Sequence, residues 1–168
     1  EFYTASGRYR SGRTENYIFY ICDRNFKDKN IKNYLNIEKH FEPFKKALKE
    51  AKIKYGTPNK PYFYLHRERE ERFFDAGVKV VCGVRVIQPS FYYTEKPYYG
   101  SRALNFIKTE RINLKYLTGI LNSNLSFFWL KNKGKQLGGL LQIDKSPLLD
   151  IPIYIGSKDE QKKIIILV

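Results

Sequence analysis

The sequence predicts an α+β fold, because strand-like and helix-like segments follow one another without the regular alternation of a doubly wound parallel sheet. The strand-like runs are short and rich in β-branched and aromatic residues. The helix-like segments carry apolar residues at intervals of three and four, and several follow a residue that favours helix capping. With 168 residues, of which 42% are hydrophobic, the chain is long enough for one domain with its own core, and a small second subdomain stays open.

The N-terminal third is predicted to contain a loop, a strand and a helix. Residues 1–14 are polar and punctuated by glycine, which is typical of a loop. Residues 17–22 are β-branched and aromatic, which predicts a buried strand. Residues 36–54 show helical spacing, and Pro43 would disrupt a continuous helix, so we expect the helix to start or kink there. The apolar positions of this helix are Phe41, Phe44, Leu48 and Ala51.

The middle of the chain is predicted to supply most of the strands. Residues 62–66 are a strand candidate, and the charge run of residues 67–72 follows them. Residues 78–87 form a longer apolar run, in which Gly83 indicates a bulge. Two further short strands are expected at residues 91–93 and 102–107, separated by a turn.

Three helices are predicted near the C-terminus from their N-cap residues. Asn113 can cap a helix over residues 114–121, and Ser123 can cap a second helix that runs to Lys131. Ser157 can cap a last helix over residues 158–168. The apolar aromatic residues 127–129 are expected to pack in the core of this helix pair, since a base-stacking surface would need them exposed.

The formal net charge of +14 is concentrated at the two ends of the chain. Residues 1–60 carry 14 basic and 7 acidic side chains, and residues 101–168 carry 11 and 5, whereas residues 61–100 carry 6 and 5. An excess of this size favours a polyanionic partner. Arg8, Arg10 and Arg13 in the N-terminal segment could follow a phosphate backbone in the same way.

The cysteine content and the lack of targeting signals are typical of an intracellular protein. Cys22 and Cys82 have no second Cys or His at metal-binding spacing, so we expect two buried, reduced thiols and no metal. No apolar run of membrane-spanning length and no signal peptide is present, so no membrane partner is expected. Because the chain lacks Met and ends within the apolar run of residues 164–168, we expect it to be a piece of a larger protein.

No catalytic constellation is visible in the sequence. The Gly-Gly pair of residues 138–139 lacks the context of a phosphate-binding loop, and no motif for amino-group methylation is present. Glu50 and Lys52 fit the last part of a nuclease motif but lie on a predicted amphipathic helix. His40 and His66 are isolated, and a lone histidine is more often structural than catalytic. We therefore expect no catalytic residue in this chain.

The strongest functional signal is an acid-free segment, because residues 111–142 contain no Asp or Glu. We interpret residues 131–142 as a flexible basic glycine loop that contacts DNA. Lys133 and Lys135, with Lys131 beside them, would bind phosphate, and Gln136 and Gln142 have the donor and acceptor that a base edge requires. The alternatives are a simple glycine turn with solvated lysines and, for Gln142, a strand that only packs.

Two arginines outside this segment are further candidates. Arg85 lies on a predicted apolar strand, where a charged residue must be paired, lie at an edge or project toward a partner. An ion pair with Asp75 or Glu95 and a contact to DNA are both open at this point. Arg102 follows a Tyr- and Ser-containing loop that could reach a groove of DNA. The interleaved charges of residues 67–72 are expected to pair among themselves.

These motifs resemble the target-recognition, or specificity, domain of TaqI-like and Eco57I-like adenine-specific DNA methyltransferases, a group that includes type IIG restriction–modification enzymes. The resemblance runs from about residue 31 onward, and residues 1–30 match the family poorly. The arginine-glutamate run after Leu65-His66 departs from the family pattern. In chain order, the matching segments are residues 64–67, 78–81, 89–93, 114–123, 128–134, 141–143, 151–153 and 159–164.

The resemblance implies irregular stacked β-strands with a C-terminal helical hairpin. It also implies two parts of the chain: an N-terminal segment, residues 1–30, and a target-recognition domain, residues 31–168, which is truncated at its C-terminus. It implies double-stranded DNA and a methyltransferase domain of the same parent chain as partners. That domain would hold S-adenosylmethionine, and Mg²⁺ would be needed only if a nuclease were fused. The fragment itself is expected to be non-catalytic, without a cofactor, and cytoplasmic in a bacterium or archaeon.

Three other functions remain open on the sequence. A half-site recognition unit of a type I restriction specificity subunit would require a long coiled-coil spacer after residue 168. An RNA-binding module would prefer single strands and depend on exposed aromatic residues. An enzyme domain for a small anionic substrate would need a cluster of carboxylates or a nucleophile, which the sequence does not display.

Overall fold

The computed structural model describes residues 4–5, 11–12, 18–27, 30–97 and 99–168, with only the backbone at 4–5 and 11–12. The chain divides into two compact units. We call Ile18–Glu70 the helical unit. The mixed unit comprises Glu1–Tyr17 and Glu71–Val168. Arg8, Arg10 and Arg13 lie outside the described residues. No helix in the described ranges combines the length and hydropathy needed to cross a membrane.

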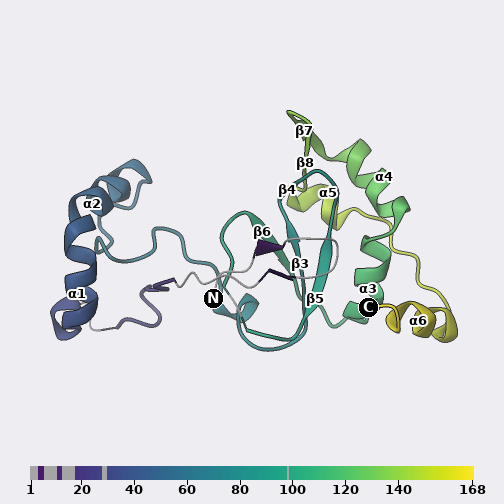
Figure 1. Ribbon diagram of the computed structural model, residues 1–168, viewed down its shortest axis with the longest axis horizontal. Coiled ribbons are helices and arrows are strands. Elements are labelled where there is room, and N and C mark those ends of the chain that lie inside the picture. The colour runs from purple at the N-terminus through teal and green to yellow at the C-terminus, as the bar shows by residue number, and fades with distance from the viewer. Residues whose placement is uncertain (1–3, 6–10, 13–17, 28–29, 98) are drawn as a thin grey trace. The chain divides into compact units, whose positions relative to one another are not determined.

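The helical unit is built around two helices with a short tighter turn between them (Figure 1). After η1 (Ile31–Asn33), the chain forms α1 (Leu35–Phe41), η2 (Glu42–Phe44) and α2 (Lys45–Lys54). The predicted kink at Pro43 is confirmed, because proline lacks the N–H that would continue the α-helical hydrogen bonding. The predicted apolar face is only partly correct, since Phe44 is exposed and the buried residue of α2 is Lys52.

Strands were expected at residues 17–22 and 62–66, and this prediction is wrong for the described residues 18–22 and 62–66. Tyr17 lies outside the described residues. The Leu65 N–H donates to the Ile21 carbonyl at 2.9 Å, but no ladder of such bonds follows. The side chains instead form an aromatic core. The apolar pattern correctly indicated burial, whereas a strand also requires a paired neighbour. The core residues are Ile21, Phe26, Ile31, Phe63 and Tyr64.

The mixed unit contains a buried three-stranded antiparallel sheet. Its central strand β3 (Lys79–Gly83) pairs with β5 (Phe91–Thr94) and β6 (Leu104–Ile107). η3 (Glu71–Phe73) precedes it. A separate ribbon pairs β1 (Thr4–Ala5) with β2 (Ser11–Gly12), so the predicted loop of residues 1–14 contains two short strands.

A second antiparallel sheet has the order β4-β8-β7. It combines β4 (Arg85–Val86) with β7 (Lys135–Leu137) and β8 (Leu140–Gln142). The predicted strand of residues 78–87 is therefore divided between two sheets, and the expected bulge at Gly83 is a change of sheet. Val84 makes the connection, because its N–H donates to Ala103 at 2.8 Å and its carbonyl accepts from Ile143 at 2.7 Å. A Cβ at Gly83 would lie 2.7 Å from a Val86 methyl, so this bend leaves no room for a side chain.

The C-terminal half supplies four helices: α3 (Leu114–Leu121), α4 (Asn124–Lys133), α5 (Lys145–Leu149) and α6 (Lys158–Ile165). The predicted caps are confirmed. Asn113 accepts from two N–H groups of α3, Ser123 accepts from Ser126, and Ser157 forms a capping box with Glu160. Because these caps act locally, the sequence is sufficient to place them.

The Asn122 side chain holds the end of α3 against the buried sheet. Its amide nitrogen donates to the Phe91 carbonyl at 2.8 Å, and its side-chain oxygen accepts from the Phe91 N–H at 2.8 Å. α6 packs closely on α3 at Gly119. A Cβ at this position would lie 2.3 Å from the Ile164 side chain, so the close approach requires glycine. The mixture of helices and small antiparallel sheets, with helices at the C-terminal end, confirms the predicted α+β class. The core of this unit comprises Val80, Cys82, Phe91, Leu114, Leu117, Leu121, Leu130, Leu141, Ile143 and Ile151.

Candidate nucleic-acid interface

A tight hairpin replaces the predicted flexible loop of residues 131–142. Lys131 and Lys133 belong to the last turn of α4, and β7 and β8 follow directly. The turn between the strands consists of Gly138 and Gly139, with φ values of +55° and +83°. Two-residue hairpin turns with positive φ at both central positions suit the twist of paired strands, and glycine adopts that conformation readily. The expectation of a loop is therefore wrong for residues 135–137 and 140–142, which form strands.

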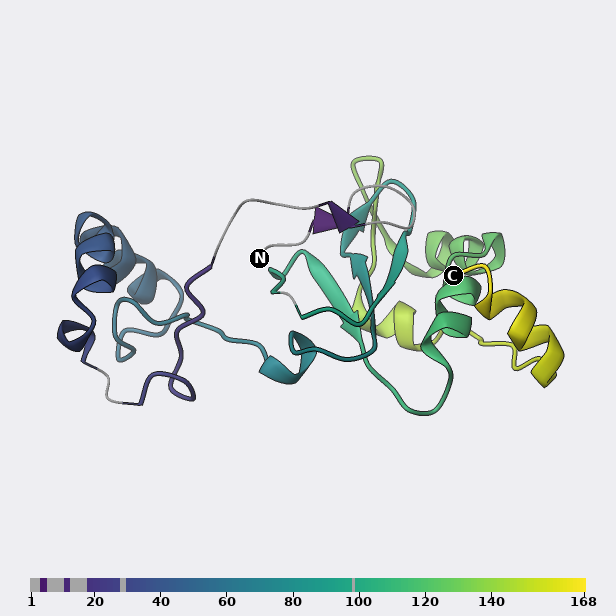
Figure 2. The same cartoon turned by 60° about the horizontal axis from the view of Figure 1, so that its bottom comes forward.

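The hairpin of β7 and β8 projects beyond the rest of the mixed unit in two different views (Figures 1 and 2). All three residues of β7 are exposed, and Leu141 is the buried residue of β8. Leu141 and the neighbouring Ile143 join the core. The base of the hairpin is thus anchored by apolar packing, while its tip and one strand are available to a partner.

Three predicted site residues from distant parts of the sequence line one pocket. Arg85 on β4 pairs in register with Gln142 on β8, and Arg102 lies beside them just before β6. The pocket has a volume of about 340 Å³, and Val84 and Ala103 complete its lining. Among the described residues, Arg85 forms no ion pair with Asp75, Glu95 or another acid, so the ion-pair alternative for Arg85 is wrong. Arg85 and Arg102 are both exposed.

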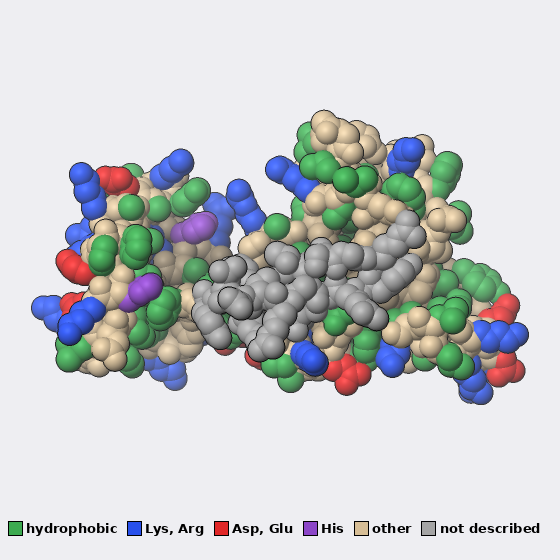
Figure 3. Space-filling model, viewed as in Figure 1, with side chains coloured by type: hydrophobic (Ala, Val, Ile, Leu, Met, Phe, Trp, Pro, Cys, Tyr) green, Lys and Arg blue, Asp and Glu red, His purple; other side chains and the backbone are tan. Residues whose placement is uncertain are grey.

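The remaining predicted site residues lie along the end of α4 and the hairpin. The Lys133 ammonium lies 5.7 Å from the centre of the Trp129 ring, and Lys135 lies opposite Gln142 in the ladder. The Gln136 amide donates to the Lys131 carbonyl at 3.2 Å, which ties β7 to the end of α4. Lys131, Lys133, Lys135 and Gln136 are exposed. In the view of Figure 3, Lys and Arg side chains but no acidic ones appear over β7, β8 and α4.

Asp144 is a residue of this interface that sequence reasoning missed. Its carboxylate accepts from the Gln142 amide at 2.7 Å and lies 3.8 Å from the Lys135 ammonium. The spacing of two residues from Gln142 was the available signal, because alternate residues of an extended segment point the same way. Asp144 therefore holds one of the two N–H donors of the Gln142 amide.

Phe128 on α4 is exposed, so the prediction that residues 127–129 all pack in the core is wrong for this residue. Phe127 and Trp129 are partly buried against the core, and the Trp129 indole N–H donates to the Pro147 carbonyl at 3.3 Å. α4 is apolar on several sides, but it packs against the core mainly through Leu130. The core can therefore accommodate only part of the aromatic run.

The residues considered for catalysis have structural contacts. Lys52 is buried and donates to the Tyr64 carbonyl, and the His66 ring stacks on Tyr55 with ring centres 4.6 Å apart. The His40 ring packs against Phe19. Within the described ranges, no group of three His, Cys, Asp or Glu residues has a metal-binding arrangement. Glu68 of the charge run pairs with Lys60, at 2.8 Å, outside that run.

Comparison with known proteins identifies the family to which this chain belongs. Residues 8–153, more than half of the chain, match the sequence model of the TaqI-like C-terminal specificity domain. The type II methyltransferase M.HincII of Haemophilus influenzae is 29% identical over 143 residues, which cover 79% of this chain and 28% of that protein. The chain thus spans less than a third of the length of this relative. The predicted domain boundary at residue 31 stays a prediction. The resemblance noted in the sequence motifs is confirmed: the chain belongs to the family of TaqI-like C-terminal specificity domains.

Proposed function

We propose that this chain binds double-stranded DNA and reads a target sequence as the specificity domain of a type II restriction–modification protein. The observation that carries this proposal is the pocket shared by Arg85, Arg102 and Gln142. Guanidinium groups donate two parallel hydrogen bonds to guanine, and glutamine pairs with adenine through its donor and acceptor. Such groups at one opening are suited to reading base edges.

The hairpin and the end of α4 supply the rest of the proposed interface. A two-stranded ribbon fits the major groove of DNA, which is about 12 Å wide. The exposed Lys131 and Lys133 at the end of α4 and Lys135 on β7 would bind phosphates, which fixes the position of the protein without reading sequence. Gln136 lies on the same ribbon and is a further candidate for a base contact.

We further propose that the whole protein methylates adenine, since M.HincII, to which this chain is similar, is a type II methyltransferase. An enzyme that modifies a base in a duplex must rotate that base out of the stack, and a separate domain that holds the duplex assists this step. The S-adenosylmethionine that such a reaction requires would be held by a methyltransferase domain of the same protein.

Duplex binding can be tested by fluorescence anisotropy against random duplex DNA, single-stranded DNA and single-stranded RNA, each at two salt concentrations. Selection from a random duplex library would then yield the target sequence. We expect duplex preference with a steep salt dependence. Preference for single strands would instead indicate an RNA-binding module, and absence of salt-sensitive binding would contradict a nucleic-acid function.

Replacing Arg85 and Arg102 by Ala should weaken binding to the selected sequence by about 1–3 kcal/mol for each base that is no longer read, with little change on random duplex. Replacing Lys133 and Lys135 by Ala should weaken binding to all sequences and reduce the salt slope by about one for each phosphate that is no longer bound. Arg111→Ala is the matched control, because Arg111 is exposed and lies outside the pocket and the hairpin. If the arginine variants behave like this control, the base-reading assignment is wrong.

A further inference from the structure

A row of lysines lies along one side of α2 in the helical unit. Lys45, Lys49 and Lys52 are separated by four and three residues, which places them on the same side of a helix. Like charges at this spacing destabilise a helix by a few tenths of a kcal/mol, about 0.2–0.5 per pair. Repulsion within the row opposes helix formation, although Lys45 pairs with Glu42 and Lys52 donates to the Tyr64 carbonyl.

The segment that follows α2 turns this row into a pocket. Lys60 and Tyr62 face Lys49 and Lys52 across a cavity of about 300 Å³. Lys45 lies at its edge, with its ammonium 5.7 Å from the centre of the Tyr62 ring. Ile53 and Pro58 form the apolar part of the wall.

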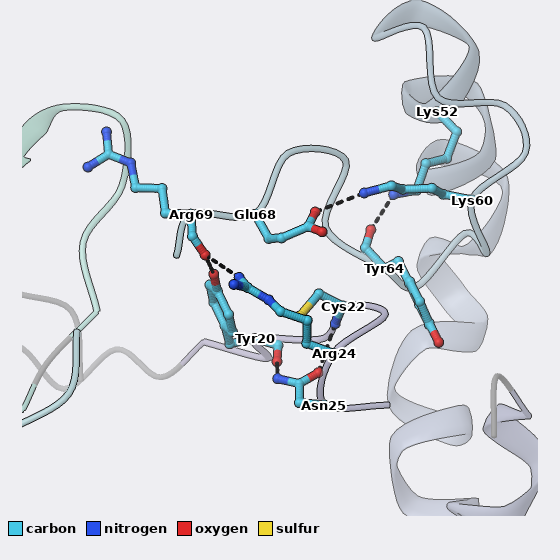
Figure 4. A network of polar contacts seen from close by, with 9 residues as sticks. All are labelled: Tyr20, Cys22, Arg24, Asn25, Lys52, Lys60, Tyr64, Glu68 and Arg69. Atoms are coloured by element: carbon cyan, nitrogen blue, oxygen red, sulfur yellow. Dashed lines mark hydrogen bonds and ion pairs between the residues drawn. The ribbon is translucent and has the colours of Figure 1, made fainter. Parts of the chain in front are cut away.

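The positive charge of this pocket exceeds the negative charge around it. Figure 4 shows the Lys60 ammonium bound to Glu68 and the Lys52 ammonium bound to the Tyr64 carbonyl. The Lys60–Glu68 distance is 2.8 Å, and Lys45 pairs with Glu42 at 3.1 Å. Lys49 and Lys52 form no ion pair with a described carboxylate. Among the residues that the structure describes, Lys49 thus has no ion-pair partner, and Lys52 has only the longer-range attraction of Glu68, which already pairs with Lys60.

The groups that line the pocket are suited to an anion. Burial lowers the pKa of Lys52, and the nearby Lys60 lowers it further, which shows that the pocket as it stands disfavours this charge. Burial also raises the pKa of Tyr62, so its hydroxyl stays protonated and able to donate. Lys52 uses one of its three N–H donors on the Tyr64 carbonyl. A bound anion would accept from the remaining donors and reduce the repulsion between the lysines.

We infer that this pocket binds a phosphate group of the DNA backbone, as a second contact outside the base-reading surface; this inference rests on the proposed function. Ammonium groups bind phosphate as point charges from many directions, whereas base reading relies on the fixed geometry of Arg, Asn and Gln. The pocket lining contains none of these three residue types. Ile53 and Pro58 offer an apolar wall to the adjoining deoxyribose.

The decisive variant is Lys49→Glu, which places a carboxylate in the pocket. Lys49 is exposed, so the change should leave the fold intact, as circular dichroism would verify. The matched control is Lys39→Glu, because Lys39 is an exposed lysine of α1 that does not line the pocket, and both variants change the net charge equally. We expect Lys49→Glu to weaken binding to random duplex DNA by about tenfold or more relative to Lys39→Glu. Its salt slope should fall by about one.

The possible outcomes separate this inference from the proposed function. If the unmodified chain binds duplex and the two variants bind equally, the pocket inference is wrong and the proposed function stands. If the unmodified chain does not bind duplex, the proposed function fails. A nuclear magnetic resonance titration with inorganic phosphate tests the pocket directly. Lys49-dependent shifts with phosphate but no Lys49 effect on duplex binding would show a site for free phosphate and overturn the assignment to DNA.

Discussion

The two three-stranded sheets of the mixed unit differ sharply in burial. In the sheet β5-β3-β6, Val80, Val81 and Cys82 of the central strand are at most 2% exposed. In the sheet β4-β8-β7, every residue of β7 is exposed, and Leu141 is the one residue of its three strands that is buried. Both sheets are antiparallel and share the chain segment that passes through Val84.

This difference assigns separate tasks to the two sheets. The buried sheet holds α3 through Phe91 and Asn122 and forms the core of the unit. The exposed sheet carries the candidate reading groups and is anchored to the core by Leu141, the neighbouring Ile143 and the partly buried Val86. A recognition surface of this kind can change its side chains without loss of the core, because surface substitutions usually alter stability by about 0.5 kcal/mol or less.

The largest effect on stability is expected from Phe91→Ala in the buried sheet. Phe91 is fully buried between β3 and α3, and such a truncation typically costs about 3–5 kcal/mol. Because small domains are stable by only about 5–15 kcal/mol, the midpoint of urea unfolding should fall markedly. Leu140→Ala in the exposed sheet is the control and should cost far less, since Leu140 is exposed. Equal losses for the two variants would refute the division between the sheets.

The buried sheet should also lose stability at alkaline pH. Burial raises the pKa of the Cys82 thiol from 9.0 to about 12. Between these values the unfolded thiol is ionised while the folded thiol keeps its proton, so unfolding releases a proton and becomes easier as the pH rises. The free energy of unfolding should then fall by about 1.4 kcal/mol per pH unit, with no contribution below pH 9.

Urea unfolding of the parent chain and of Cys82→Ala over this pH range would measure the contribution of Cys82. The variant should be less stable below pH 9 but should lose the Cys82 part of the alkaline slope. Burial, together with the hydrogen bond to Glu95 and the charge of that carboxylate, raises the pKa of Tyr93 to about 12, so Tyr93→Phe separates its contribution to the slope above pH 10. An unchanged slope in Cys82→Ala would mean that this thiol does not drive alkaline unfolding.

The features predictable from sequence are those fixed by local chemistry. Asn113, Ser123 and Ser157 cap their helices as expected, and Pro43 divides the first helix, because each acts within one turn. Residues 18–22 lack a strand partner, which no local pattern reveals. The hairpin of β7 and β8 did carry a local signal, because Gly138 and Gly139 separate residues 135–137 from residues 140–142, and both runs contain Leu and Gln.

The grouping of candidate site residues depended on pairings between distant segments. Arg85 meets Gln142 only through the ladder of β4 and β8, and Arg102 joins them only through the turn before β6. Residue type identified each of the three separately, but their common pocket required the fold. The burial of Lys52 was not predictable either, because its surroundings are supplied by Lys60 and Tyr64 from the segment after α2.

The smallest expected change in stability offers the sharpest test of the exposed sheet. Gly139 has a φ of +83°, where a residue with a Cβ is strained by about 1–2 kcal/mol, and no atom within 4 Å would obstruct that Cβ. Gly139→Ala should thus cost little global stability but should loosen the hairpin turn. Gly56→Ala in the helical unit is a matched control, with a φ of +68° and equally open surroundings. If the hairpin reads DNA, Gly139→Ala should weaken binding to the selected sequence more than Gly56→Ala, although both variants unfold at similar urea concentrations. If the two variants bind the selected sequence equally, the hairpin turn does not contribute to reading. Both variants introduce the same kind of backbone strain, and only Gly139→Ala changes the hairpin.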